Sequence, residues 1–395
     1  MQDIPVYLNH LGIVCSLGRG AEQVWQTLQQ PDAEPLTLAD EWMSTPVYVG
    51  QVKAELPPLA QFAAERQSRN NQLLMSAWQQ LQVAFAAMRQ GIAAERIGIV
   101  LGSSTSGIAE AFSTVQGWVN HQQPATATRY AIQEMSAPAL SLADWSGAKG
   151  PTYVVSTACS SGAKALASAR RLIQQDVCDL VIAGGVDSLA AMTLNGFGAL
   201  ESLATAVCAP FSAHRDGINI GEGAALFIMS KEPAAVTLAG VGESSDAHHI
   251  SAPHPQGAGA IAAMSQALQQ RQLNPEQVSY INLHGTATEQ NDRMESQAVF
   301  RLFGDRVAAS STKALTGHTL GAAGAIEAAF CWLTMQQDGR LPPHRWDGVP
   351  DPALAPLRLV TAGLKLDHPP VFTLSNSFAF GGNNISLLFE RIYGD

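Results

Sequence analysis

Short apolar and β-branched runs alternate with longer, alanine-rich stretches along this chain of 395 residues. Runs that are apolar throughout predict strands covered on both faces, and an alternation of strands with helices is typical of α/β proteins. The predicted strands are residues 97–104, 152–157, 179–185, 224–230, 278–285, 307–312 and 370–377. The pattern therefore indicates an α/β fold around a buried sheet.

Two segments share one pattern, a strand that passes through small residues into a helix. One follows Tyr153 (VVSTACSSGAKALASARRLI) and the other follows Arg306 (VAASSTKALTGHTLGAAGAIEAAFCWLTM). Two such units are a hint of internal duplication. We place the boundary near residues 231–241, which gives an N-terminal half of 1–235 and a C-terminal half of 236–395. No low-complexity linker separates the halves, so we expect them to share an interface.

Composition narrows the class of protein. Charged residues are 14% of the chain, against about 25% in an average protein, so much of the chain is interior or interface. The net charge of −10 disfavours nucleic-acid binding. Five scattered cysteines without a C-x-x-C pair fit a reducing cytoplasm rather than a disulfide framework. We expect neither a signal peptide nor a membrane span, because Asp3, Asn9 and His10 interrupt the apolar N-terminus and no apolar run is long enough.

Cys159 is the candidate nucleophile. It stands in STACSSGAKAL, between a predicted strand and a helix that begins near Ser160. The positive end of a helix macrodipole favours a thiolate, so we expect the pKa of this thiol to lie below the free value of about 8.5. A buried structural cysteine is the alternative. The small neighbours favour the nucleophile, because a substrate carbonyl must approach the sulfur closely.

His284 and His318 are candidate partners for this thiol. His284 lies in NLHGTATEQND at the end of a predicted strand, and His318 lies in STKALTGHTLGAAG, where a strand gives way to a glycine-rich helix. Each alone reads as an ordinary polar residue, but two histidines and a cysteine at strand ends form a set suited to acyl transfer. Lys313 and Glu327 stand in an otherwise small and apolar stretch, so we expect an ion pair or hydrogen-bond chain that supports His318.

The C-terminal segment SNSFAFGGNN places Phe378 and Phe380 beside a glycine pair. A core strand ending in a tight turn is the plain interpretation. The functional interpretation is a backbone N–H directed at an oxyanion, with an aromatic ring guarding the pocket.

Rival motifs are incomplete. Ser310–Lys313 fits S-x-x-K, but no K-T-G follows, and there is neither G-x-S-x-G nor a P-loop. The G-x-G-x-x-A at 257–262 does not directly follow a strand, which disfavours a dinucleotide site. His248, His249 and His254 raise the question of zinc, but acyl transfer requires no metal and we expect none.

Four motifs in order resemble those of the β-ketoacyl-acyl-carrier-protein synthases, most closely the elongating types I and II: TACSS, LHGTAT with Asp292 after it, STKALTGHTLGAAGA and NSFAFGG. The resemblance covers essentially the whole chain. It implies the thiolase fold, a duplicated five-layer αβαβα body of the α/β class, which usually dimerises. It also implies decarboxylative condensation of an enzyme-bound acyl thioester with malonyl-acyl-carrier protein, in fatty acid or specialised polyketide or polyene synthesis.

The resemblance also implies residue roles. Cys159 would accept the acyl chain, His284 and His318 would stabilise the enolate, and Lys313 with Glu327 would support them. The remaining implied site residues are Thr286 and Thr288 for pantetheine, Phe197 near the acyl pocket, and Phe380 as gate and oxyanion donor. No cofactor is implied beyond the phosphopantetheine that carries the substrates on acyl carrier protein.

The chain departs from the family pattern at three positions. Asn291 replaces Gly in HGTxTxxGD, Asn383 replaces Thr in GGTN, and Ser212 replaces Asp in PFD. These departures concern fine geometry and substrate preference rather than the reaction class.

The resemblance leaves the assembly open. Carrier proteins of this family are acidic, so Arg66 and Arg69 are our candidates for docking, although Glu201 stands where relatives often have a base. The chain is either a homodimer or the active half of a heterodimer with a chain-length-factor subunit. The alternative is a non-catalytic chain-length-factor-like partner, but such partners typically lack the nucleophile.

Overall fold

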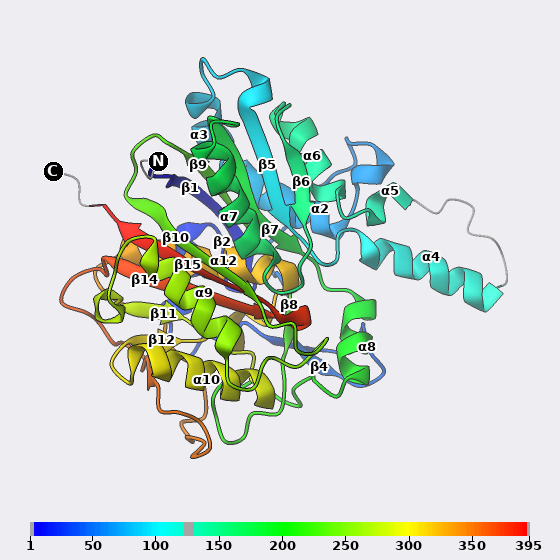
Figure 1. The fold of residues 1–395 in the computed structure, drawn as a ribbon. Coiled ribbons are helices and arrows are strands. Elements are labelled where there is room, and N and C mark those ends of the chain that lie inside the picture. The colour runs from blue at the N-terminus through cyan, green and yellow to red at the C-terminus, as the bar shows by residue number, and fades with distance from the viewer. Residues whose placement is uncertain (1–3, 122–129, 393–395) are drawn as a thin grey trace.

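The computed structural model describes residues 4–121 and 130–392 (Figure 1). Among these residues, eleven strands follow one another in one sheet whose two halves join where β1 pairs with β10, and a twelfth strand, β2, pairs with β1 outside this order. The N-terminal half has the order β6 (Thr152–Val155), β5 (Ile97–Gly102), β7 (Leu180–Asp187), β9 (Gly223–Ser230) and β1 (Tyr7–Cys15). The C-terminal half has the order β13 (Arg358–Leu359), β12 (Ala308–Ser310), β11 (Tyr280–Asn282), β14 (Phe372–Ala379), β15 (Asn383–Arg391) and β10 (Val236–Ser245).

The two halves repeat one pairing pattern. In the first, β6, β5 and β7 are parallel, and β9 and then β1 follow as antiparallel strands. In the second, β12, β11 and β14 are parallel, and β15 and then β10 follow as antiparallel strands. The predicted duplication is therefore confirmed. All seven predicted strands are present. The parallel strands β5, β7, β11 and β12 are fully buried, as their apolar sequences indicated, whereas β6 at the edge of the sheet is only partly buried.

Helices complete the five layers. Helices α7 (Ser161–Gln174) and α12 (Ala323–Met335) pack on each other between the two halves of the sheet. On the outer faces lie α2 (Arg69–Gln79) and α6 (Ala137–Ser146) on the N-terminal side, and α9 (Ala258–Gln269) and α10 (Glu289–Phe303) on the C-terminal side. Small residues set the close approach of the central helices, since a Cβ on Gly324 would lie 2.7 Å from that of Ala163.

Shorter elements surround this core. A three-stranded sheet contains β3 (Thr37–Ala39), β4 (Val47–Gly50) and β8 (Ile220–Gly221). The remaining elements are β2 (Gly18–Arg19), α1 (Ala21–Gln29), η1 (Ala64–Arg66), α3 (Gln82–Met88), η2 (Ala94–Arg96), α4 (Ile108–His121), α5 (Tyr130–Gln133), α8 (Ala191–Ala199), η3 (Pro275–Gln277), α11 (Lys313–Thr316), η4 (Leu320–Ala322) and η5 (Phe380–Gly382).

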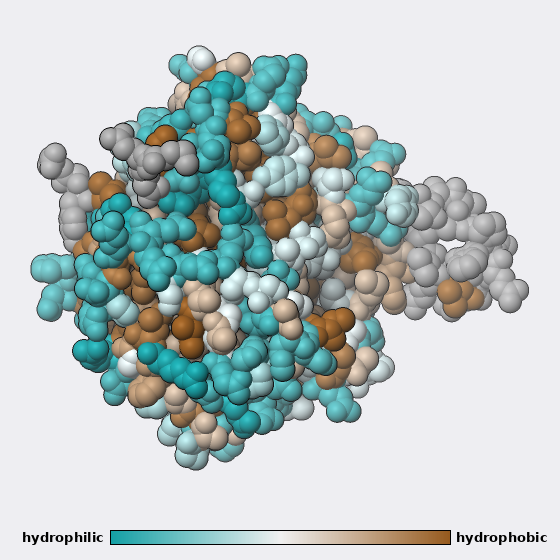
Figure 2. Space-filling view, in the orientation of Figure 1, coloured by the Kyte–Doolittle hydropathy of each residue, from teal (hydrophilic) through white to brown (hydrophobic). Residues whose placement is uncertain are grey.

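The surface seen in Figure 2 is mixed, with hydrophobic residues scattered among hydrophilic ones. Helix α4 projects from the body on the side of α5, which it contacts (Figure 1). Among the described residues, no helix combines the length and apolar character needed to cross a membrane.

Candidate active site

Cys159 lies on a sharp turn between β6 and α7, and α7 begins at Ser161 as predicted. Ala158 has a φ of 52°, in the left-handed region that residues with a Cβ rarely occupy. The turn is held by Ser161, whose Oγ accepts from the backbone N–H of Thr157 and donates to the carbonyl of Ala158. Strained turns of this kind are found where a side chain must be presented at one point. The turn directs the Cys159 thiol into a cavity.

The pKa of the Cys159 thiol is raised to about 11, so our expectation of a lowered pKa is wrong. Burial is the main cause, because only 7% of this residue is exposed and a thiolate would lose its hydration. The charge of Lys313 and the backbone N–H groups of Phe380 and Cys159 act in the opposite direction but do not offset burial. At neutral pH the Cys159 side chain is therefore a neutral thiol.

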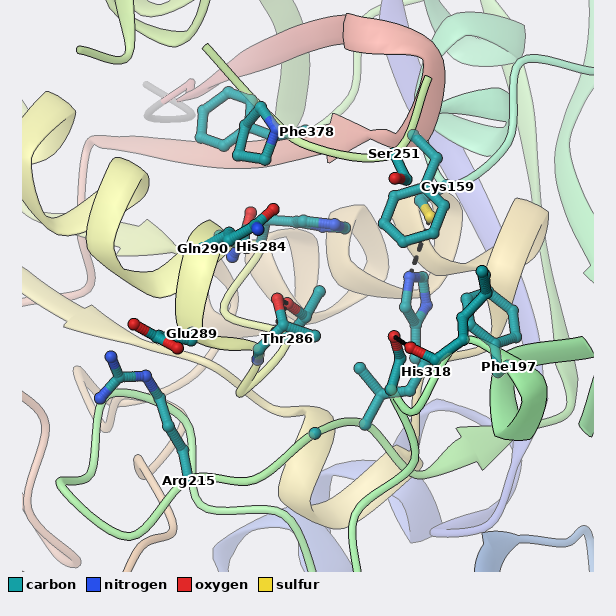
Figure 3. Close-up of a pocket in the computed structure, with 18 of the residues that line it drawn as sticks. Cys159, Phe197, Arg215, Ser251, His284, Thr286, Glu289, Gln290, His318 and Phe378 are labelled. Carbon is teal, nitrogen blue, oxygen red and sulfur yellow. Dashed lines mark hydrogen bonds between the residues drawn. The ribbon is translucent and has the colours of Figure 1, made fainter. Parts of the chain in front are cut away.

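His318 provides the nearest partner for this thiol. Its Nε2 lies 3.0 Å from Cys159 Sγ (Figure 3), while its Nδ1 accepts a hydrogen bond from the backbone N–H of Leu320 at 3.1 Å. Because Nδ1 is an acceptor, the proton of the neutral ring is on Nε2, which points at the sulfur. Sequence analysis placed His318 where a strand gives way to a helix; the structure places it after the short helix α11, paired as a bridge with Ile220.

His284 lies two residues after β11, at the strand end where we predicted it. Its ring centroid lies 5.4 Å from that of His318, with the two planes nearly perpendicular. Lys313 Nζ lies 3.5 Å from its Nδ1 and 2.5 Å from its backbone oxygen. An ammonium group can only donate, so Nδ1 of His284 is an acceptor and its Nε2 carries the proton. Both imidazoles thus offer an Nε2–H donor.

Lys313 and Glu327 form a buried ion pair, as predicted, with side chains 1% and 4% exposed. The pair contacts a different histidine from the one that we expected, because Lys313 lies beside His284 rather than His318. Burial lowers the pKa of both imidazoles well below the usual value, and the charge of Lys313 lowers them further. Burial also raises the pKa of Glu327 to about 7, although Lys313 opposes this shift. The two histidines are consequently held neutral.

A cavity of about 430 Å³ leads to these groups. The predicted site residues that line it are Cys159, His284, His318, Phe197, Phe380, Thr286 and Thr288. Lys313 and Glu327 lie behind this lining, where Lys313 contacts His284. The rings of Phe197 and Phe380 lie 5.9 Å apart, and the hydroxyls of Thr286 and Thr288 lie 2.9 Å apart. Figure 3 shows Arg215 and Glu289 at the end of this cavity away from Cys159. We call this space the Cys159 cavity.

Two departures from the family pattern have clear contacts. Ser212 is fully buried and its Oγ donates to Asp347 at 2.7 Å. Asn291 is buried and its amide lies 3.2 Å from Asp292 Oδ1. Asp292 in turn accepts from the backbone N–H groups of Phe211 and Ala287. Asn291, which lines the cavity, therefore joins a network at its wall, whereas Ser212 joins a buried network outside the lining.

The proposed docking arginines already have anionic partners. Arg69 binds the fully buried Glu222 through its Nε and one terminal nitrogen, and Arg66 pairs with Asp144 at 2.9 Å. The charge of Arg69 thus compensates a buried carboxylate. The exposed acidic residues Glu201, Asp216 and Glu289 line the cavity. Docking of acyl carrier protein through Arg66 and Arg69 stays a prediction. Both guanidinium groups are already paired with carboxylates of this chain, which reduces their attraction for an acidic carrier protein.

Sequence analysis missed two buried carboxylates that position the site. Glu295 accepts the backbone N–H groups of His284 and Gly285 at 2.8 and 2.7 Å. Asp187 accepts from the backbone of Ser104, Thr105 and Gly321, which ties the N-terminal half to the turn after His318. Asp187 ends the apolar run that forms β7, and that placement was a usable signal; Glu295 lies within a polar helix sequence and gave none.

Metal-type ligands also cluster at this site. Across residues 4–121 and 130–392, the side chains able to ligate one ion as a group of three or more are Cys159, His284 and His318, whose ligand atoms lie within 4.8 Å of one another. Their hydrogen bonds to one another and to the backbone match an acid–base set. His248 and His254 have ring centroids 5.3 Å apart, and His248 and His249 are exposed.

Comparisons with known proteins agree with this geometry. The N-terminal domain of beta-ketoacyl synthase matches residues 11–235, and the C-terminal domain of the same family matches residues 235–345. The chain is 33% identical to 3-oxoacyl-[acyl-carrier-protein] synthase 2 of Staphylococcus aureus over 75% of this chain and 76% of that protein. It is 31% identical to the protein of the same name from Synechocystis sp., covering 98% of both.

A solved structure covers nearly all of both chains. A chain of the complex of the ketosynthase ApeO with its chain length factor ApeC, from Xenorhabdus doucetiae, superposes with a TM-score of 0.93 and 40% identity over 99% of each chain. A beta-ketoacyl synthase from Burkholderia phymatum gives a TM-score of 0.89 at 27% identity, over 98% of this chain and all of that one. The duplicated fold, the cavity and both family matches lead to one assignment: the chain belongs to the β-ketoacyl synthase family, whose members condense carrier-bound acyl units in fatty acid or polyketide synthesis.

Proposed function

We propose that Cys159 is the acyl acceptor of a decarboxylative condensation and that the two histidines act on the enolate. The observation that carries this proposal is the Nε2 of His318, 3.0 Å from Cys159 Sγ, with His284 facing the same cavity. In the first half-reaction the sulfur attacks the acyl thioester of phosphopantetheine. The thiol proton passes, overall, to the departing pantetheine sulfur. The oxyanion accepts from the backbone N–H groups of Cys159 and Phe380, whose influence on the thiol supports this placement.

In the second half-reaction malonyl-carrier protein loses CO₂, and the electrons of the broken C–C bond remain as an enolate. The two Nε2–H groups donate to the enolate oxygen in a site with little water. The carbanion carbon then attacks the acyl thioester, a C–C bond forms, and Cys159 leaves as a thiolate that takes up a proton. Neither half-reaction changes the oxidation state of a protein group, so we propose that no cofactor is needed besides the carrier's phosphopantetheine.

Intact-protein mass spectrometry tests these roles. Wild type incubated with acyl-carrier-protein thioesters should gain one acyl mass, and Cys159→Ala should gain none. His284→Ala and His318→Ala should still be acylated, while release of CO₂ from malonyl-carrier protein falls by about 10²–10³-fold, the usual effect of losing one oxyanion donor. Acylation of Cys159→Ala, or normal CO₂ release by both histidine variants, would contradict the assigned roles.

We also propose that this chain is the active half of a heterodimer with a chain-length-factor-like subunit. The ApeO–ApeC complex supports this pairing, because one of its chains is 40% identical to this chain, against 33% and 31% for the two synthase 2 relatives. Within the described residues, β6 pairs only with β5, so its outer edge is open. Helix α6 packs against β6, α5 contacts α6, and α4 contacts α5. These three helices carry the exposed hydrophobic residues Phe112, Val119, Tyr130 and Leu140. Open edges and apolar patches are typical of interfaces.

Size-exclusion chromatography with mass measurement tests the pairing. The chain produced alone should aggregate or acylate poorly, and co-production with a paired ketosynthase-like subunit should give a 1:1 complex that acylates. We further propose a specialised polyketide or polyene product rather than ordinary saturated fatty acids. A soluble homodimer that extends saturated acyl chains at full rate would refute both proposals.

A further inference from the structure

The loop that carries Phe380 is the short connection between the paired strands β14 and β15, whose residues Ala379 and Asn383 pair across it. It consists of η5, in which Gly381 and Gly382 have φ values of 80° and 73°, and it leads directly into Asn383, the first residue of β15. Its backbone contacts are with the segment after β10: Gly381 N–H donates to Ile250 O at 2.7 Å, and Gly382 O accepts from Asp246 N–H at 2.8 Å. Ile250 is 80% exposed. The strand pairing fixes the base of the loop, its tip contacts the surface segment that contains Ile250, and Asn383 contacts helix α7.

Lys164, on helix α7, contacts the residue that follows this loop. Its Nζ lies 3.3 Å from Oδ1 of Asn383, the residue that replaces the family's threonine. Lys164 belongs to α7, the helix that follows Cys159, and its side chain is 17% exposed. Glu243 is the nearby anion, but its distance to Lys164 is 3.8 Å, and it binds Arg171 at 2.6 Å. Asn383 is thus the closer acceptor for the Lys164 ammonium.

We propose that Lys164 and Asn383 form a latch that fixes the Phe380 loop to the nucleophile helix and positions the Phe380 N–H for acyl transfer. This inference rests on the roles proposed above for Cys159 and Phe380. Lys164 and Asn383 are positioning residues, since neither touches the reacting atoms. The latch connects the half of the chain that carries the nucleophile to the half that carries the second oxyanion donor. It also gives a physical reason for the asparagine in GGNN, because an amide oxygen reaches further than a threonine hydroxyl.

The two half-reactions depend on this loop to different degrees. Acyl transfer to Cys159 uses the Phe380 N–H, whereas decarboxylation of malonyl thioester uses the Nε2–H groups of His284 and His318. These imidazoles are fixed by Leu320, Lys313 and Glu295, which are independent of Asn383. A loosened loop should therefore slow acyl transfer and leave decarboxylation intact, or speed it where the Phe380 ring limits malonyl entry.

Three substitutions in the full chain, with its partner subunit present, test the latch. Lys164→Met and Asn383→Ala each remove the contact, and Arg171→Met removes the neighbouring pair with Glu243 without touching the loop. Acylation from acyl-carrier protein is measured by intact mass, and CO₂ release from malonyl-carrier protein is measured on a Cys159→Ala background. Loss of a hydrogen bond to a charged group should slow acylation by roughly tenfold. CO₂ release should not fall, and Arg171→Met should change neither rate.

A double-variant cycle separates the latch from a merely structural role. Lys164→Met with Asn383→Ala should acylate no more slowly than either single variant, because both remove the same contact. Lys164→Arg, which can still donate to Asn383, should recover most of the rate. Additive losses, or equal losses in acylation and CO₂ release, would overturn the latch. If wild type itself is not acylated, the proposed function fails instead, so the two failures are distinguishable.

Discussion

The two halves of this duplicated fold contribute different chemistry to one cavity. The N-terminal unit passes from β6 through one tight turn into α7, and the turn presents Cys159 among hydroxyl side chains. The equivalent C-terminal passage from β12 to α12 is longer and contains α11, which carries Lys313, and the segment with His318. One copy thus holds an uncharged nucleophile, and the other holds the ion pair and both imidazoles.

Burial and the charge of Lys313 have different effects on the pKa values of the groups from the two halves. Burial alone favours the neutral form of every group, and it raises the pKa of Cys159 while lowering those of His284 and His318. The charge of Lys313 pushes in the same direction at the histidines but in the opposite direction at the thiol. Burial is thus the main cause of the neutral imidazoles, while the single buried cation reinforces it there and favours the thiolate form of Cys159.

The largest effect should come from removing that cation. Lys313→Met leaves Glu327 buried without its partner, and breaking a buried ion pair from one side typically costs about 3–5 kcal/mol. We expect the free energy of unfolding, measured by urea titration, to fall by about this amount. Lys313→Met combined with Glu327→Met should recover much of the loss, because no charge then remains buried. A single variant as stable as wild type would show that the C-terminal half does not depend on this pair.

The second prediction concerns the protonation state of the Cys159 thiol, the uncharged group from the N-terminal half. Iodoacetamide reacts with the thiolate, and a folded-state pKa of about 11 leaves few thiolates at neutral pH. The rate of Cys159 alkylation should therefore keep rising with pH beyond 8.5, and at pH 8 it should be on the order of a hundredfold below that of an ordinary free thiol. Cys159→Ala measures the background from other cysteines. A plateau near pH 8.5 or below would restore the lowered pKa that we expected from the helix N-terminus.

The sequence predicted those features of the fold and site that depend on one local motif. The apolar runs predicted the strands, and TACSS, LHGTAT and GHTLGAAG predicted which three side chains would meet. The pKa of Cys159 could not be predicted this way, because its burial depends on Phe380 and on residues from both halves. The partner of Lys313 among the histidines was equally hidden, since it depends on how α11 is placed after β12. Glu295 supports His284 through backbone contacts that leave no side-chain pattern to recognise.

The smallest predicted effect concerns the contact between the halves at Ser212. This fully buried hydroxyl donates to Asp347 and accepts from the backbone N–H of His214. Ser212→Ala should lower the free energy of unfolding by about 1 kcal/mol, the usual contribution of one or two hydrogen bonds. Ser202→Ala is the control, because that hydroxyl bonds only the nearby Leu200 carbonyl at a more exposed position.

Replacing Ser212 by the aspartate of the family pattern tests whether the serine is adapted to Asp347. Ser212→Asp would place a carboxylate against that of Asp347, which accepts the present hydrogen bond at 2.7 Å. Like charges at this distance repel, so we expect Ser212→Asp to be less stable than Ser212→Ala at neutral pH. Ser212→Asp combined with Asp347→Asn should remove the repulsion and regain stability. If Ser212→Asp alone is as stable as wild type, the serine is not an adaptation to Asp347, and the halves tolerate the family's arrangement at this contact.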